Sequence, residues 1–141
     1  MKNVGMKPES YRIAKASAEL LAPAHCIQLL ADGNTEKGDA LKTARIAGIL
    51  AAKRTDELIP LCHPLPIYRA DVEFELLEDR VVIYAEVETI GPTGVEMEAL
   101  TAASLAGLTI SVSFPALSFA IDTPVDYAGS RLKHATRLDS N

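Results

Sequence analysis

The stretch YRADVEFELLEDRVVIYAEV, residues 68–87, decides the fold of this 141-residue chain. Apolar and charged residues alternate in both halves, a period that is typical of strands with one buried face. Two acidic residues, Glu78 and Asp79, separate the halves at a turn. The stretch therefore predicts an antiparallel hairpin whose buried faces carry Tyr68, Ala70, Val72, Phe74 and Leu76 on one strand and Val81, Ile83, Ala85 and Val87 on the other.

Two segments rich in alanine and glycine flank the hairpin. Residues 40–54, ALKTARIAGILAAKR, follow Asp39, a good N-cap, and residues 96–108, EMEALTAASLAGL, follow a loop that contains Gly94. Both segments predict slim helices. Small side chains let another backbone come close, so we expect each helix at a helix–helix contact or a subunit interface.

The ends of the chain give weaker signals. Arg12, Ala14, Ala16 and Ala18 alternate with other residues, which suits a strand by spacing, whereas the alanines suit a helix by propensity. Pro23 predicts the start of a short helix that ends at Asp32 and Gly33. Alternation after residue 110 is weak. Mixed strands and helices around a hairpin indicate an α+β fold, and we expect a single domain over residues 1–141.

Composition excludes several classes of protein. Nineteen acidic residues against 14 basic ones, with 5% aromatics and no Trp, argue against a nucleic-acid partner. Residues 99–121 carry no charge over 23 positions, yet they include Pro115 and six serines or threonines. A buried helix that runs into extended chain fits better than a membrane span. We expect no membrane partner and a cytoplasmic protein without a disulfide scaffold.

Charge is unevenly distributed along the chain. Residues 1–60 hold nine Lys or Arg against seven acids, whereas residues 61–110 hold two Arg against nine acids. A site that needs both cations and carboxylates must therefore bring the two segments together.

His63 is the leading chemical candidate. It lies between Cys62 and Pro64, in a proline-rich segment that cannot be helical and that holds its backbone rigid. A histidine at such a position can act as a general acid or base, and a structural histidine is the open alternative. Zinc is a rival, because the adjacent pairs His25-Cys26 and Cys62-His63 could supply four ligands. Neither pair has the usual zinc spacing, which disfavours that interpretation.

Glu96 and Glu98 open the second slim helix. Residues two apart point about 200° apart, so both carboxylates share a face only where the helix start is distorted. They could instead complement the helix dipole, although Gly94 would let a ligand approach the backbone. Lys37, in a turn before a helix, suits phosphate binding, although GNTEKGD matches a phosphate loop only weakly, and a solvated surface lysine is the alternative.

Two long motifs carry a resemblance. KGDALKTARIAGILAAKRTDELIPLCHPL and TGVEMEALTAAS are similar to the cyclic pyranopterin monophosphate synthase family (MoaC, protein C of molybdenum cofactor biosynthesis). The similarity runs from about Tyr11 to Ile110.

The resemblance implies a ferredoxin-like α+β fold and a lyase. This lyase converts (8S)-3′,8-cyclo-7,8-dihydro-GTP to cyclic pyranopterin monophosphate with release of pyrophosphate. It implies a homohexamer, a trimer of dimers, with sites at subunit interfaces. It implies no resident cofactor and no metal site, and leaves open whether magnesium accompanies the triphosphate.

The resemblance also assigns residues. Lys37, His63 and Glu96 match catalytic positions. Arg12, matched to an arginine supplied by a neighbouring subunit, joins the substrate-binding set, which otherwise comprises Leu61, Cys62, His63, Met97 and Glu98.

The sequence departs from the family after Ile110. The positions of the family's catalytic aspartate and lysine hold Val112 and Pro115. A frame change or divergence would each produce this ending, and Asp122, Asp126 and Lys133 are candidate substitutes. The alternative function is therefore a relative that binds the precursor without efficient turnover.

Overall fold

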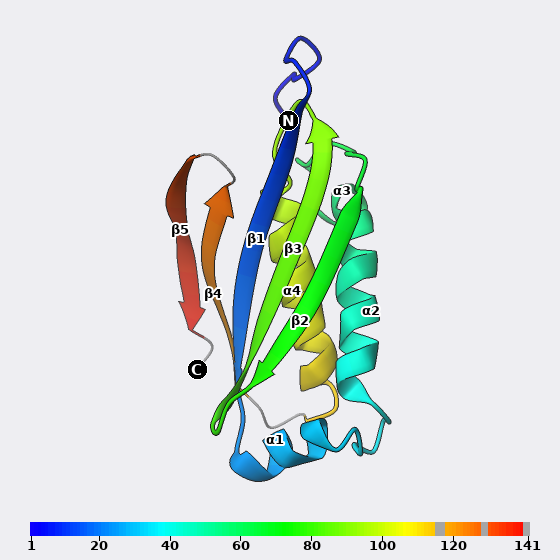
Figure 1. Ribbon diagram of the computed structural model, residues 1–141, viewed down its shortest axis with the longest axis vertical. Helices are drawn as coiled ribbons and strands as arrows, with labels where there is room; N and C mark the ends of the chain where they lie inside the picture. The colour runs from blue at the N-terminus through cyan, green and yellow to red at the C-terminus, as the bar shows by residue number, and fades with distance from the viewer. Residues whose placement is uncertain (115–117, 128–129, 140–141) are drawn as a thin grey trace.

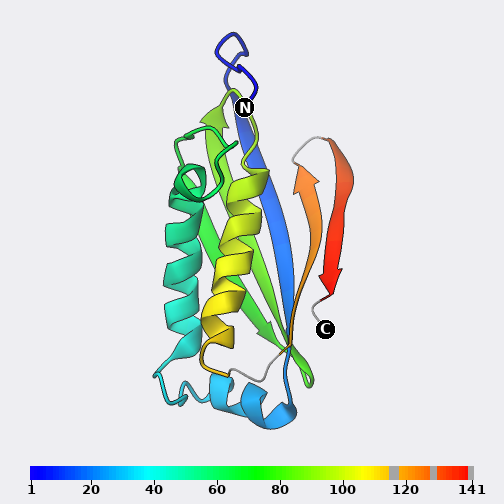
Figure 2. The ribbon, with the colours of Figure 1, turned by 180° about the vertical axis from the view of Figure 1, so that it is seen from behind.

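The computed structural model is a five-stranded antiparallel sheet with helices on one face (Figures 1 and 2). It describes the backbone of residues 1–114, 118–127 and 130–139, and side chains up to residue 114. The elements are β1 (Ser10–Leu21), α1 (Ala24–Ala31), α2 (Ala40–Lys53), α3 (Thr55–Leu58), β2 (Arg69–Leu76), β3 (Arg80–Gly91), α4 (Glu96–Ser111), β4 (Ser118–Tyr127) and β5 (Ser130–Asp139).

The strand order β2-β3-β1-β4-β5 confirms the expected fold class. Strands β1 to β4, with α2 connecting β1 to β2 and α4 connecting β3 to β4, make the β-α-β-β-α-β arrangement of ferredoxin-like domains. Figure 2 shows α2 and α4 side by side over β2, β3 and β1. Among the described residues no helix covers the other face of these three strands, here called the open face (Figure 1).

The ambiguous first segment is a strand. β1 pairs with β3 along its whole length, from Ser10 opposite Gly91 to Leu21 opposite Arg80. Ala14, Ala16 and Ala18 face the helices and are buried. Pairing with β3 outweighs the helical propensity of alanine, because in a strand every second side chain packs into the core.

The predicted hairpin is confirmed as β2 and β3, except that Tyr68 precedes β2 and is exposed where a buried position was predicted. Val72, Val81, Ile83 and Val87 are fully buried beneath the helices. Arg69 lies on the open face, where its guanidinium pairs with three carboxylates, those of Asp71, Glu86 and Glu88.

Helix ends follow the sequence closely. The Asp39 carboxylate accepts a hydrogen bond from the Lys42 amide at 3.1 Å, as an N-cap should. α1 begins one residue later than predicted, so Pro23 is its N-cap and not its first helical residue. The Pro23 carbonyl accepts hydrogen bonds from the amides of Cys26 and Ile27. Among the described residues no helix is long and apolar enough to cross a membrane.

The slim faces of α2 and α4 pack against each other, which confirms the expected helix–helix contact. A Cβ atom on Gly48 would lie 2.9 Å from the Ala102 carbonyl oxygen and 3.0 Å from Cγ2 of Val72. Ala102, Ala103 and Ala106 are fully buried along α4. Only glycine lets α2 lie this close to both α4 and the sheet.

We predict that Gly48→Ala lowers the free energy of unfolding by roughly 1 to 3 kcal/mol, because the added methyl group meets backbone that must move. Denaturant unfolding measures the effect. Lys53→Ala, at an exposed position of the same helix, is the matched control and should change stability by less than about 0.5 kcal/mol. Equal stability of Gly48→Ala and the parent would contradict the close contact.

Candidate functional site

A cavity of about 170 Å³ lies where α4 begins, and the loop between α3 and β2 covers it. It holds six of the eight residues that the family resemblance assigns. Two segments about 30 residues apart supply them: Leu61, Cys62 and His63 from the loop, and Glu96, Met97 and Glu98 from the first turn of α4.

The loop is fixed at both ends by hydrogen bonds. Near its start the Cys62 amide donates to the Ile59 carbonyl at 3.0 Å, closing a turn after α3. Near its end the Thr89 hydroxyl donates to the Pro66 carbonyl, and the Tyr68 amide donates to Glu88. Pro60, Pro64 and Pro66 keep the intervening chain extended, so His63 lies on a rigid support.

Gly94 explains how two carboxylates of one helix line a single cavity. A Cβ atom on Gly94 would overlap the carboxylate of Glu96. The Glu96 side chain therefore folds back over Gly94, while Glu98 is buried with only 4% of its surface exposed. The sequence predicted that a shared face needs a distorted helix start, but here the orientation of the Glu96 side chain brings both carboxylates to the cavity, and the missing side chain of Gly94 makes room for it.

Glu98 is the most perturbed acid of the site. Burial raises its pKa to about 7, and the negative charges of Glu96 and Asp56 add to the effect. A carboxyl group with a pKa near neutrality can both donate and accept a proton at physiological pH. Sequence reasoning gave this residue a binding role, because burial is not readable from the spacing of two glutamates.

Burial also raises the pKa of the Cys62 thiol, with the charges of Glu98 and Asp56 as smaller causes. The thiol therefore stays protonated near neutral pH, which makes it a poor nucleophile and a poor metal ligand.

Arg12 lies at the same end of the molecule as the cavity. It occupies the start of β1, and its Nε donates to the Gly91 carbonyl at 3.3 Å. Gly91 ends β3 and begins the loop that leads to Gly94. The hydrogen bond thus holds Arg12 at the start of the loop that supplies Thr93 and Gly94 to the cavity.

Lys37 lies in the segment between α1 and α2, which is at the other end of the molecule (Figure 1). It is exposed in the turn before α2, which the pairing of Thr35 with Gly38 closes. The 14 residues of α2 separate this turn from α3 and the cavity, a span of roughly 21 Å at the helical rise. Val112 follows the last residue of α4 at this same distant end.

The family's remaining catalytic position, Pro115, lies outside the described residues. Asp122 and Asp126 are on β4 and Lys133 is on β5, where the structure describes the backbone but not the side chains.

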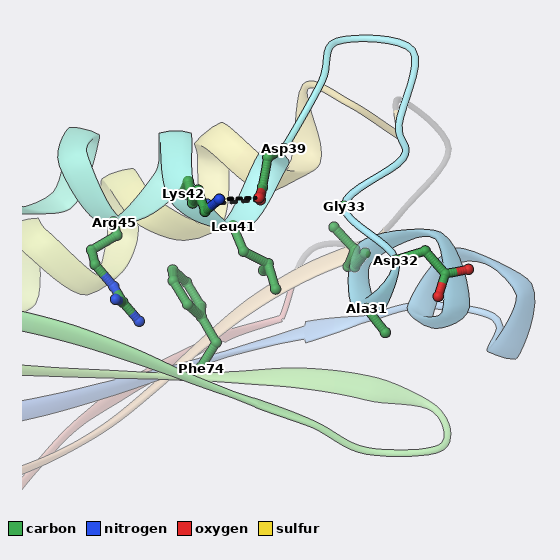
Figure 3. Close-up of a pocket in the computed structure, with 9 residues that line it drawn as sticks. Ala31, Asp32, Gly33, Asp39, Leu41, Lys42, Arg45 and Phe74 are labelled. Carbon is green, nitrogen blue, oxygen red and sulfur yellow. Dashed lines mark hydrogen bonds and ion pairs between the residues drawn. The ribbon is translucent and has the colours of Figure 1, made fainter.

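A larger cavity of about 370 Å³ lies near the Lys37 end, between α1, α2 and β2 (Figure 3). Its charged groups are already paired within the chain. Arg45 lies over the ring of Phe74 and donates to the Val72 carbonyl at 2.9 Å, and Lys42 pairs with Asp39. These contacts hold α2 on β2, so volume alone does not mark the functional site.

The four-ligand zinc interpretation is wrong for this fold. His25 and Cys26 are on α1, at the end of the molecule away from the loop of Cys62 and His63 (Figure 1). The two pairs do not converge, and the described residues contain no cluster of three His, Cys, Asp or Glu side chains suited to a metal ion.

Comparison with known proteins agrees with this geometry. A family model described as "MoaC family" matches residues 1–116. The cyclic pyranopterin monophosphate synthase of Streptomyces griseus is 52% identical over 110 residues, 78% of this chain and 62% of the relative. The synthase of Thermomicrobium roseum is 49% identical over 112 residues, 78% of this chain and 68% of the relative.

Cyclic pyranopterin monophosphate synthase 1 of Mycobacterium tuberculosis is 51% identical over 111 residues, 78% of this chain and 65% of the relative. The chain thus spans about two thirds of the length of these curated relatives.

We predict that Glu98→Gln stabilises the chain above about pH 7 and has little effect near pH 5. In the folded state the Glu98 carboxyl keeps its proton up to about pH 7, whereas its ordinary pKa is 4.5. Between these values the folded state binds more protons than the unfolded state, so the parent's free energy of unfolding falls as pH rises. Glutamine removes this slope, a difference of up to roughly 3 kcal/mol above pH 7.

Denaturant unfolding at about pH 5, 6, 7 and 8 measures the difference. Glu57→Gln removes an exposed carboxyl on α3 and serves as the control that should keep the parental slope. Parallel stability curves for Glu98→Gln and the parent would show that Glu98 is not protonated in the folded chain.

Proposed function

Because this chain belongs to the MoaC family, we propose that it is a cyclic pyranopterin monophosphate synthase. The reaction converts (8S)-3′,8-cyclo-7,8-dihydro-GTP to cyclic pyranopterin monophosphate and pyrophosphate in molybdenum cofactor biosynthesis, which we place in the cytoplasm. One observation supports this most directly: the six matched residues of two separate motifs line one cavity around a buried carboxyl.

The reaction needs proton transfers and the neutralisation of phosphate charge. His63 and Glu96 carry the proton transfers, and Glu98 lies beside them with a pKa near neutrality. Lys37 and Arg12 are cations that can stabilise charge as the cyclic phosphate forms and pyrophosphate leaves. The proposal requires no metal ligand from the protein, and magnesium would enter with the triphosphate.

We propose that the chain assembles as the homohexamer that the family resemblance implies, a trimer of dimers, and the positions of these groups support a site shared between chains. In one chain Lys37 and the His63 cavity are separated by the length of α2. A two-fold interface can bring opposite ends of two identical chains together, since residue i of one chain then contacts residue j of the other and the reverse. The Lys37 turn of one chain would then complete the cavity of its neighbour.

Binding of the precursor without efficient turnover is the second candidate function. It is favoured by Val112, which stands at the family's catalytic aspartate position and cannot exchange a proton. Loss of a positioned proton-transfer group lowers rates by a factor of roughly 10² to 10⁴. This chain would then keep the substrate cavity but not the full catalytic set.

Incubation of the purified chain with the cyclised GTP precursor distinguishes the two functions. Release of pyrophosphate with formation of the pterin product supports the synthase. Binding by calorimetry without product supports the second candidate. If the chain neither binds nor converts the precursor, both proposals are wrong.

We predict that His63→Ala abolishes precursor binding or lowers turnover at least about 100-fold, because it removes a positioned proton-transfer group. Light scattering should give the same assembly as the parent. His25→Ala, an exposed histidine on α1 at the far end, is the matched control. A His63→Ala variant that binds and turns over like the parent would contradict the assignment of the site.

A further inference from the structure

Residues 1–9 form an arm that precedes β1 at the cavity end of the molecule (Figures 1 and 2). Two local hydrogen bonds shape it. The Asn3 side-chain oxygen accepts from the Gly5 amide at 2.9 Å, and the Lys7 amide donates to the Val4 carbonyl at 3.0 Å. Except for the half-buried Val4, every residue of the arm is exposed, so the arm adds little to the core.

The arm makes one contact with the candidate site. The Lys2 carbonyl oxygen lies 2.6 Å from Nε2 of His63. A backbone carbonyl can only accept a hydrogen bond, so Nε2 must carry a proton. In a neutral imidazole the other ring nitrogen, Nδ1, is then the one that can accept a proton.

We infer that the N-terminal arm is a positioning element of the site, in which the Lys2 carbonyl holds His63 in the Nε2–H tautomer and leaves Nδ1 as the proton acceptor. The prolines on either side of His63 restrain its backbone but not its ring. A partly exposed ring exchanges between both tautomers in water. The contact from the arm selects one of them.

The contact with His63 is made by the backbone oxygen of Lys2 and not by its side chain. Variants can therefore separate the effect of the carbonyl from that of the side chain. Lys2→Ala removes the side chain and keeps the carbonyl. Deletion of residues 1–8 removes the carbonyl and leaves the core untouched, since these residues precede β1. Asn3→Ala keeps every carbonyl but removes the hydrogen bond that turns the arm.

The test is nuclear magnetic resonance of ¹⁵N-labelled protein, with two-bond proton–nitrogen correlations of the imidazole rings at about pH 8.5, above the ordinary titration range of histidine. His63→Gln identifies the His63 signals. We expect the Nε2–H pattern, with an observable Nε2 proton, in the full chain and in Lys2→Ala. Deletion of residues 1–8 should move both ring nitrogen signals toward their average and abolish the Nε2 proton signal, and Asn3→Ala should do so in part.

An unchanged Nε2–H pattern after deletion would overturn the inference, as would an Nδ1–H pattern in the full chain. Circular dichroism of each variant shows that the fold is retained. The role of Nδ1 as proton acceptor in catalysis rests on the proposed function, whereas the tautomer of His63 does not. The tautomer is measured without substrate, so failure of the synthase proposal and failure of this inference are separate results.

Discussion

The close approach of α2 to α4 is the constraint on which this molecule depends. Gly48 leaves room for the Ala102 carbonyl and for Val72 of the sheet, so both helices lie flat on the same three strands. That packing fixes the ends of the helices. The start of α4 lies beside the loop after α3, and the end of α4 lies near the turn before α2 (Figure 1).

Because the helix ends are fixed, the candidate site residues of one chain lie at two opposite ends of the molecule. The carboxylates, His63 and Arg12 are at one end, and Lys37 is at the other, about the length of α2 away. A site that needs both sets is complete only where two chains meet.

Sequence reasoning predicted the elements well where local signals agree, as in the β2–β3 hairpin and the Asp39 cap. It could not choose strand or helix for β1, because the alanines support both until β3 provides a partner. For the site, the motifs predicted which residues gather in the cavity. They could not predict the buried state of Glu98, the position of the Glu96 carboxylate over Gly94, or the contact from Lys2, because these depend on the three-dimensional arrangement of the side chains.

A site shared between chains is the central claim, and precursor binding by mixed assemblies tests it most directly. Lys37→Ala and His63→Ala chains with different tags are coexpressed, and assemblies that contain both are purified and titrated with the cyclised GTP precursor. Each variant alone should bind weakly or not at all. In a hexamer whose chains pair at random, about one quarter of the sites are restored, those that take the intact Lys37 of a His63→Ala chain and the intact His63 of a Lys37→Ala chain. No restored binding in the mixed assemblies would contradict a shared site.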